Sequence, residues 1–155
     1  MRCFRYERLL QWSECDPAGI IFFPHYARWM VDGVNLLLLA LGVDPVGTTE
    51  AGAQRGLPST GLTMRFLAPA RLHDRLVHEI AVTMIGSKSL SFTHRFLRGE
   101  HCLAEADETR VWAESDAAGM RSVLLPDSLK ALLEDDTPLT HPLVRSPDSQ
   151  TASIQ

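Results

Sequence analysis

Cysteine is scarce in this sequence, and its three cysteines lie far apart. Cys3, Cys15 and Cys102 are odd in number and widely spaced, a pattern that fits neither a disulfide framework nor paired zinc ligands. Such cysteine usage is typical of a reducing compartment, so we expect a cytoplasmic protein.

Long hydrophobic runs and excess positive charge are also missing. The start, MRCFRYERLLQW, has no uninterrupted apolar stretch of the kind found in signal peptides. The longest apolar run, LLLLAL at residues 36–41, is far too short to span a bilayer alone. The net charge of −4 at pH 7 argues against a general affinity for nucleic acid. We therefore expect neither a membrane nor a nucleic acid as partner.

Motifs for nucleotides and metals are missing too. The sequence has no P-loop and no Gly-x-Gly-x-x-Gly pattern, and we predict no cofactor. His73, Asp74 and His78 come nearest to a metal cluster. Asp74 and His78 would share one face of a strand, but no third ligand is evident. We expect these residues at the surface and predict no metal site.

What remains is the composition of an ordinary globular protein. Hydrophobic residues make up 45% and charged residues 22% of the chain, and 155 residues correspond to one domain. We place this domain at residues 1–136. Residues 137–155 are rich in Pro, Ser and Thr with little periodicity, which predicts a mobile tail.

The order of predicted elements is a strand, a long helix and then several strands. The first strand covers residues 3–12. The helix begins at Pro24 and runs for about 18 residues to a stop at Gly42. Residues 44–60 are predicted as a loop or short helix. Further strands are predicted at 61–72, 75–86, 87–98, 101–115 and 120–125, with a last helix from residue 127, which together give an α+β fold.

The second half of the long helix, VNLLLLAL at residues 34–41, is apolar nearly all the way round. A helix of this kind is surrounded by protein. Because no other long helix is predicted to cover it, either a sheet curves around it or a partner subunit covers part of it.

A lone carboxylate stands in the apolar stretch ECDPAGIIFFPHYARW, residues 14–29, just ahead of this helix. Pro17 biases Asp16 away from the helical region, and Gly19 permits a turn that other residues resist. A helix start carries unpaired N–H groups and the positive end of the helix dipole. Because Pro24 has no N–H, the free amides lie just before and after it. From the residues alone, an ordinary Asp-Pro turn is the commoner explanation of this aspartate.

The same stretch resembles the active-site motif of the 4-hydroxybenzoyl-CoA thioesterase family of hotdog proteins. That motif is Asp-x-x-Gly followed by apolar residues and a Tyr, here Asp16, Gly19 and Tyr26. CDPAG and the later RW match the aryl-CoA branch, and FLAPARLHD at residues 66–74 resembles the family's second-strand segment. The resemblance implies a hotdog fold, in which an antiparallel sheet of five or six strands wraps around one long central helix. It also implies an acyl-CoA thioesterase that releases a free acid and CoA, with 4-hydroxybenzoyl-CoA or benzoyl-CoA as the type of substrate.

The resemblance assigns roles to individual residues. Asp16 is the nucleophile or general base, and the backbone N–H of Phe23 polarises the thioester carbonyl. Gly19 and Tyr26 complete the predicted catalytic set. Cys15 is not predicted to be the nucleophile, because it has no histidine at a useful spacing and neighbouring residues in extended chain point opposite ways.

Two positions depart from many relatives. Phe23 stands where broad-specificity relatives have His, and this substitution favours an aromatic acyl group. Val31 stands where many relatives have an acidic residue, with Asp32 next to it, so the resemblance leaves open any role for a helix carboxylate.

Coenzyme A carries phosphates, which require cations or backbone donors. The segment GSKSLS at residues 86–91 is the best candidate, because relatives carry basic and hydroxyl residues in that region. We predict Lys88 and Ser89 as CoA-binding residues, with Arg55 as a further cation. An ordinary polar hairpin tip is the alternative.

Hotdog relatives pair their sheets edge to edge and place their active sites at the subunit interface. We therefore expect a homo-oligomer, either a dimer or a homotetramer. Two other functions stay open: a non-catalytic module that binds acyl-CoA or acyl carrier, and a thioesterase for aliphatic acyl-CoA. Asp16 distinguishes the first of these, because binding alone needs no carboxylate beside the carbonyl.

Overall fold

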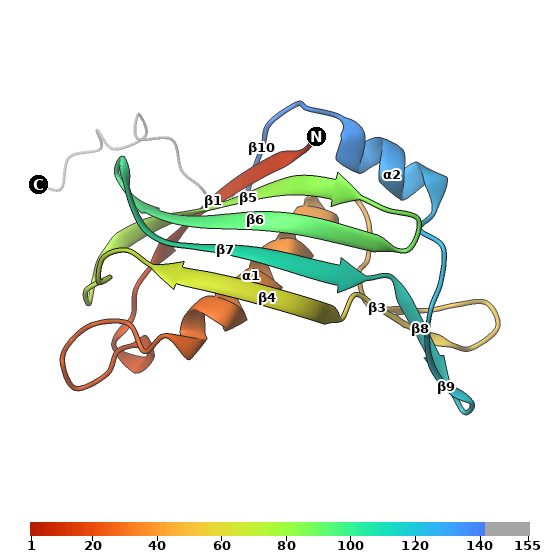
Figure 1. Ribbon diagram of the computed structural model, residues 1–155, viewed down its shortest axis with the longest axis horizontal. Helices are drawn as coiled ribbons and strands as arrows, with labels where there is room; N and C mark the ends of the chain where they lie inside the picture. The colour runs from red at the N-terminus through yellow and green to blue at the C-terminus, as the bar shows by residue number, and fades with distance from the viewer. Residues whose placement is uncertain (142–155) are drawn as a thin grey trace, which may run out of the picture.

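The computed structural model describes residues 1–141, which form a large curved sheet with a long helix against one face (Figure 1). The sheet has six strands in the order β10-β1-β5-β6-β7-β4. Neighbouring strands are antiparallel, apart from the parallel pair β1 and β10. The strands are β1 (Cys3–Leu9), β4 (Ser59–Phe66), β5 (Arg75–Ile85), β6 (Ser89–Arg98), β7 (His101–Val111) and β10 (Leu139–Thr140).

The long helix α1 (Pro24–Ala40) begins and ends close to where its caps predict. Pro24 occupies the first helical position, where its missing N–H costs nothing, and Gly42 follows the end with a φ of +74°. Its sheet-facing side chains are buried, whereas Leu39 on the other side is 57% exposed. Residues 1–141 of one chain therefore do not cover this helix on all sides. Among the helices of residues 1–141, none is long and apolar enough to cross a membrane.

Gly33 allows α1 to lie directly on β5. A Cβ atom at this position would lie 2.6 Å from Ile80 Cδ1 and 2.8 Å from His78 Cε1, which is closer than carbon atoms can pack. The helix therefore approaches the middle of the sheet as closely as its backbone permits.

A second sheet of four short strands, in the order β2-β3-β8-β9, extends from the end of β7 (Figure 1). Its strands are β2 (Gly47–Thr48), β3 (Gln54–Gly56), β8 (Ala113–Asp116) and β9 (Gly119–Ser122). The prediction of a loop or short helix at 44–60 is thus wrong. Strands of two or three residues are too short to show periodicity, and β3 forms by pairing with the distant β8.

The end of the described chain packs back onto its beginning. Helix α2 (Asp127–Glu134) buries Leu129 and Leu133, and the guanidinium of Arg2 donates hydrogen bonds to the Leu132 carbonyl. Strand β10 then pairs with β1. Two residues of the predicted tail, Leu139 and Thr140, thus form a strand, and residues 142–155 of that tail lie outside the described residues.

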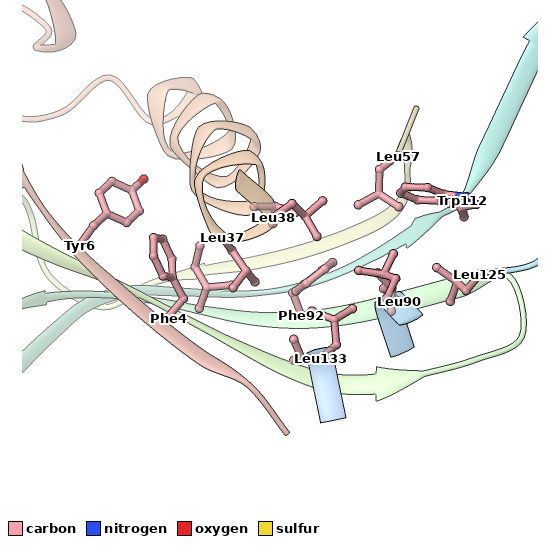
Figure 2. Packing of buried hydrophobic residues seen from close by; sticks show 14 residues of the cluster. Phe4, Tyr6, Leu37, Leu38, Leu57, Leu90, Phe92, Trp112, Leu125 and Leu133 are labelled. Carbon is pink, nitrogen blue, oxygen red and sulfur yellow. The ribbon is translucent and has the colours of Figure 1, made fainter. Parts of the chain in front are cut away.

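The hydrophobic core has two clusters, one toward each end of α1. The cluster around the second half of α1 joins the helix to both sheets and to α2 (Figure 2). It includes Phe4, Leu37, Leu38, Leu57, Phe92, Trp112 and Leu133. The other cluster surrounds the first half of the helix and includes Leu10, Ile21, Tyr26, Trp29, Met30, Leu76 and Phe96.

A row of polar side chains crosses the core beneath α1. His78 Nδ1 lies 2.9 Å from the Tyr6 hydroxyl, His78 Nε2 lies 2.9 Å from His94 Nδ1, and His94 Nε2 lies 3.2 Å from a Glu108 oxygen. Both histidines are fully buried. The expectation of His78 at the surface is therefore wrong, because its hydrogen bonds are satisfied by neighbouring strands rather than by water.

Candidate active site

Residues 14–22 form a tight antiparallel loop that leads into α1. The Phe22 N–H donates to the Glu14 carbonyl at 2.9 Å, and the Asp16 N–H donates to the Ile20 carbonyl at 2.9 Å. Gly19 turns the chain with a φ of +76°, a conformation that favours glycine. The loop thus carries Asp16 on one side, and its other side runs into the start of α1.

The Asp16 carboxylate is half-buried and only partly engaged. Its Oδ1 atom accepts a hydrogen bond from the Ala18 N–H at 2.8 Å, as in an Asx-turn. No group in residues 1–141 bonds to Oδ2. The turn fixes the direction of the side chain, and Oδ2 is free to meet a ligand.

Phe23 is the last residue before α1 and supplies an unused backbone donor. Its neighbours are paired, since Phe22 N–H donates to Glu14 and His25 N–H donates to the Phe22 carbonyl. In the described part of the chain, the N–H of Phe23 has no acceptor. A free N–H at the positive end of a helix favours an oxygen atom that bears or develops negative charge.

A cavity of about 350 Å³ opens beside this helix start. It is lined from two chain segments, residues 20–26 and residues 66–69, and its lining is almost wholly apolar. The loop after β4 lies against the Asp16 loop, because the Ile21 N–H donates to Ala70 and the Leu72 N–H donates to Gly19. The two sequence segments that carry the family resemblance are therefore neighbours in space.

Aromatic rings form one wall of this cavity. The ring of Phe66 lies 6.0 Å from that of Phe23 in an edge-to-face arrangement and 5.9 Å from that of Tyr26. Tyr26 is 2% exposed, and burial raises the pKa of its hydroxyl to about 12. The Tyr26 hydroxyl therefore stays protonated near neutral pH, and within residues 1–141 it has no hydrogen-bond partner.

Glu14 is a site residue that the sequence reasoning missed. Its Oε1 atom accepts hydrogen bonds from Trp29 Nε1 at 2.8 Å and from Arg8 at 3.2 Å, and its Oε2 atom accepts from the Gln11 N–H at 3.0 Å. Burial alone would raise the pKa of this carboxyl, but these donors outweigh it and lower the pKa. The only sequence signal was a charged residue two positions before Asp16 in an apolar stretch.

The three predicted CoA-binding residues meet around Trp112. The Trp112 N–H donates to the Lys88 carbonyl, the guanidinium of Arg55 lies 5.5 Å from the Trp112 ring centroid, and Ser89 begins β6. The Lys88 ammonium donates to the Ser122 carbonyl at 3.3 Å. This group lies at the end of the sheet opposite the Asp16 loop (Figure 1). The 17 residues of α1, roughly 25 Å, run between the two places.

The remaining candidates have structural surroundings. The Cys15 thiol has a raised pKa, because burial and the charges of Glu14 and Asp16 disfavour the thiolate, so it is a poor nucleophile. Asp32 lies 3.5 Å from the Arg8 guanidinium, and Val31 is exposed. No group of three or more potential metal ligands is found among residues 1–141.

Comparison with known proteins gives the family. Residues 10–133 match the thioesterase-like superfamily, and the chain belongs to this superfamily. It is 29% identical over 132 residues to 4-hydroxybenzoyl-CoA thioesterase of Pseudomonas sp. (strain CBS-3), covering 81% of this chain and 93% of that protein. It is 23% identical over 125 residues to 1,4-dihydroxy-2-naphthoyl-CoA hydrolase of Microcystis aeruginosa, covering 81% and 88%.

A solved structure confirms the predicted hotdog fold. An aspartate-to-asparagine mutant of 4-hydroxybenzoyl-CoA thioesterase, complexed with 4-hydroxybenzoyl-CoA, superposes with a TM-score of 0.73 at 24% identity. The match covers 86% of this chain and 99% of that chain. Both proteins therefore share one architecture over nearly the whole of the solved relative.

Proposed function

We propose that this protein is an acyl-CoA thioesterase that hydrolyses aromatic acyl-CoA to the free acid and CoA. One observation carries the proposal. A carboxylate oxygen and a helix-start N–H, both without a partner among residues 1–141, lie on the two sides of one short loop beside an apolar cavity. Thioester hydrolysis needs these two groups next to the acyl carbon.

The residues divide the chemistry between them. The Phe23 N–H binds the carbonyl oxygen and stabilises the negative charge that develops on it. Asp16 Oδ2 then acts by one of two routes. It attacks the acyl carbon and expels the CoA thiolate to leave a mixed anhydride that water hydrolyses, or it removes a proton from the water that attacks. Gly19 provides the turn that orients Asp16.

An aromatic acyl group suits the cavity. Its wall offers the rings of Phe23, Tyr26 and Phe66, and aromatic groups pack favourably edge to face with such rings. The curated relatives above are named for 4-hydroxybenzoyl-CoA and 1,4-dihydroxy-2-naphthoyl-CoA, both aromatic thioesters. These names support the aromatic class without choosing among its members.

The position of Lys88 supports a site shared between two copies. Lys88 and Arg55 lie at the far end of the sheet from Asp16. If all of them act on one acyl-CoA molecule, the phosphate-binding residues come from a second subunit. Strand β4 is one of the two edge strands of the large sheet as described for residues 1–141, and an edge strand can pair with a strand of another copy.

The test is Asp16→Asn with a panel of acyl-CoAs, assayed by thiol release. We expect unchanged folding, retained acyl-CoA binding and a fall in kcat of at least ~100-fold, which is the scale of a lost general base. A wild-type rate with a confirmed substrate would refute the role of Asp16. Binding of acyl-CoA by the unmodified protein without hydrolysis of any panel member would instead favour a binding module.

Single-turnover hydrolysis in heavy-oxygen water examines the two routes. Label in the Asp16 carboxylate shows an anhydride that water attacks at the aspartyl carbon. Label only in the product acid agrees with direct attack by water, and equally with attack on an anhydride at its acyl carbon.

A further inference from the structure

Glu14 connects four parts of the chain around the Asp16 loop. Its carboxylate accepts hydrogen bonds from Arg8 just before the end of β1, from the N–H of Gln11 and from Trp29 in α1. Its backbone carbonyl accepts the N–H of Phe22. No other carboxylate among residues 1–141 joins this loop to α1.

These contacts hold the two proposed catalytic groups, the Asp16 carboxylate and the Phe23 N–H, at fixed positions relative to each other. Trp29 is fully buried in α1, and the Arg8 guanidinium covers its ring at 4.5 Å from the centroid. The Glu14 side chain fixes one side of the loop to this indole, while its carbonyl holds the other side next to Phe23. The position of Asp16 relative to the helix start is therefore set through Glu14.

We propose that Glu14 is a positioning residue, which holds Asp16 in register with the Phe23 N–H without touching the substrate. This inference rests on the proposed thioesterase function. Displacement of a reacting group by about 1 Å can cost on the order of 100-fold in rate. Loss of the Glu14 contacts should thus lower kcat while leaving the cavity, and hence KM, nearly unchanged.

Glu14→Gln is the informative substitution because it keeps the shape of the side chain. Glu14 receives donors on both oxygens, whereas glutamine has one acceptor oxygen and an NH₂ group. At least one donor, from Gln11, Trp29 or Arg8, then faces another donor, and the loop must shift.

Glu79→Gln is the matched control. Glu79 is also buried, at 8% exposed against 7% for Glu14. It also pairs with arginines, Arg5 and Arg95, but on β5 and away from the Asp16 loop. Both substitutions therefore remove a buried negative charge, but only Glu14→Gln also removes a contact with α1.

The experiment is a double-mutant cycle with Asp16. We expect Glu14→Gln to lower kcat by about 10- to 100-fold with KM changed less than about threefold. Glu79→Gln should keep the wild-type kcat. In the Asp16→Asn background, adding Glu14→Gln should change kcat by less than about twofold, because a residue that acts through Asp16 has nothing left to position.

Each other outcome overturns part of the scheme. The positioning role is refuted if Glu14→Gln lowers kcat by the same factor in the wild-type and Asp16→Asn backgrounds, or if Glu14→Gln keeps the wild-type kcat. The thioesterase assignment stands in both cases. A wild-type rate for Asp16→Asn refutes the catalytic assignment and this inference with it. Circular dichroism checks folding, and Glu14→Asp, which is too short to reach both Gln11 and Trp29, replaces Glu14→Gln if that variant does not fold.

Discussion

His78 Nε2 and His94 Nδ1 lie 2.9 Å apart in the middle of the core, so one proton lies between the two rings. The Glu108 carboxylate accepts from His94 Nε2, and because burial lowers the pKa of His94, the neutral ring accepts from His78 at Nδ1. The Tyr6 hydroxyl has one proton and two acceptors within reach, His78 Nδ1 at 2.9 Å and the Trp29 carbonyl at 3.2 Å, and the two acceptors share it. Both histidines are fully buried, and burial lowers the pKa of each, which favours two neutral imidazoles.

The neutral pair predicts a loss of stability in mild acid. Burial, followed by the charges of His94 and Arg8, lowers the pKa of His78 well below the ordinary 6.5. Burial also lowers the pKa of His94, although Glu108 opposes this. The unfolded chain therefore binds more protons, so the stabilising contribution is full above about pH 6.5 and is lost as pH falls through the folded-state pKa values.

Denaturant unfolding at pH 7.5 and at steps down to pH 5 checks this prediction. Each buried neutral histidine contributes a slope of up to about 1.4 kcal/mol per pH unit below the unfolded pKa. His101→Gln, at an exposed position on β7, should leave the slope unchanged. A free energy of unfolding that stays constant from pH 7 to pH 5 would contradict the neutral assignment.

Lys88→Ala should raise KM for acyl-CoA more than it lowers kcat. A contact with a phosphate stabilises the ground state and the transition state alike, so its loss mainly weakens binding. The effect should shrink at high salt, where exposed charges are screened. Lys130→Ala is the control, because Lys130 pairs with Asp127 on α2. Equal CoA binding by Lys88→Ala and wild type at low salt would remove Lys88 from the site.

Phe66→Leu should shift the preference from aromatic toward aliphatic acyl groups. Phe66 lines the cavity with Phe23 and Tyr26, and an aromatic pair adds about 0.5–1.5 kcal/mol beyond its buried area. The ratio of kcat/KM for benzoyl-CoA over hexanoyl-CoA should therefore fall about two- to tenfold. Phe22→Leu changes a similarly exposed ring outside the cavity lining and should leave the ratio as it was.

Sedimentation should show a dimer or a tetramer at micromolar concentration. Strand β4 lies at one edge of the large sheet, and its Leu62 is 47% exposed. Leu62→Lys should weaken assembly and activity together, since a charged edge strand resists pairing. Met84→Lys, which is equally exposed on β5, should do neither. An active wild-type monomer would be incompatible with a shared site.

Local sequence signals were enough to predict the main elements. Pro24 and Gly42 mark the ends of α1, and apolar alternation such as that of Leu90, Phe92 and Phe96 marks the long strands. Caps and period-two patterns are encoded by neighbouring residues. Elements formed by distant pairing, such as β3 with β8 and β10 with β1, leave no such signal.

Buried polar groups were the harder part of the candidate site. Asp16 and Gly19 were identifiable because they belong to a motif of fixed spacing. Glu14 and His78 were not, because a charged or polar residue is expected at the surface until its partners are known. Their partners Trp29 and His94 come from other elements of the fold, which only the tertiary structure brings within reach.

Among residues 1–141 the cavity is lined by two short stretches, residues 20–26 and 66–69, and the row of His78, His94 and Glu108 lies outside both. Phe66 and Leu67 are each more than half exposed and belong to neither core cluster, so variation at these two positions can reshape the cavity wall without disturbing the groups that hold the fold together. Descendants of one ancestral gene can therefore diverge in substrate preference while they inherit the same Asp16 loop and helix start. For laboratory selection of new activities, residues 66 and 67 are the positions to randomise.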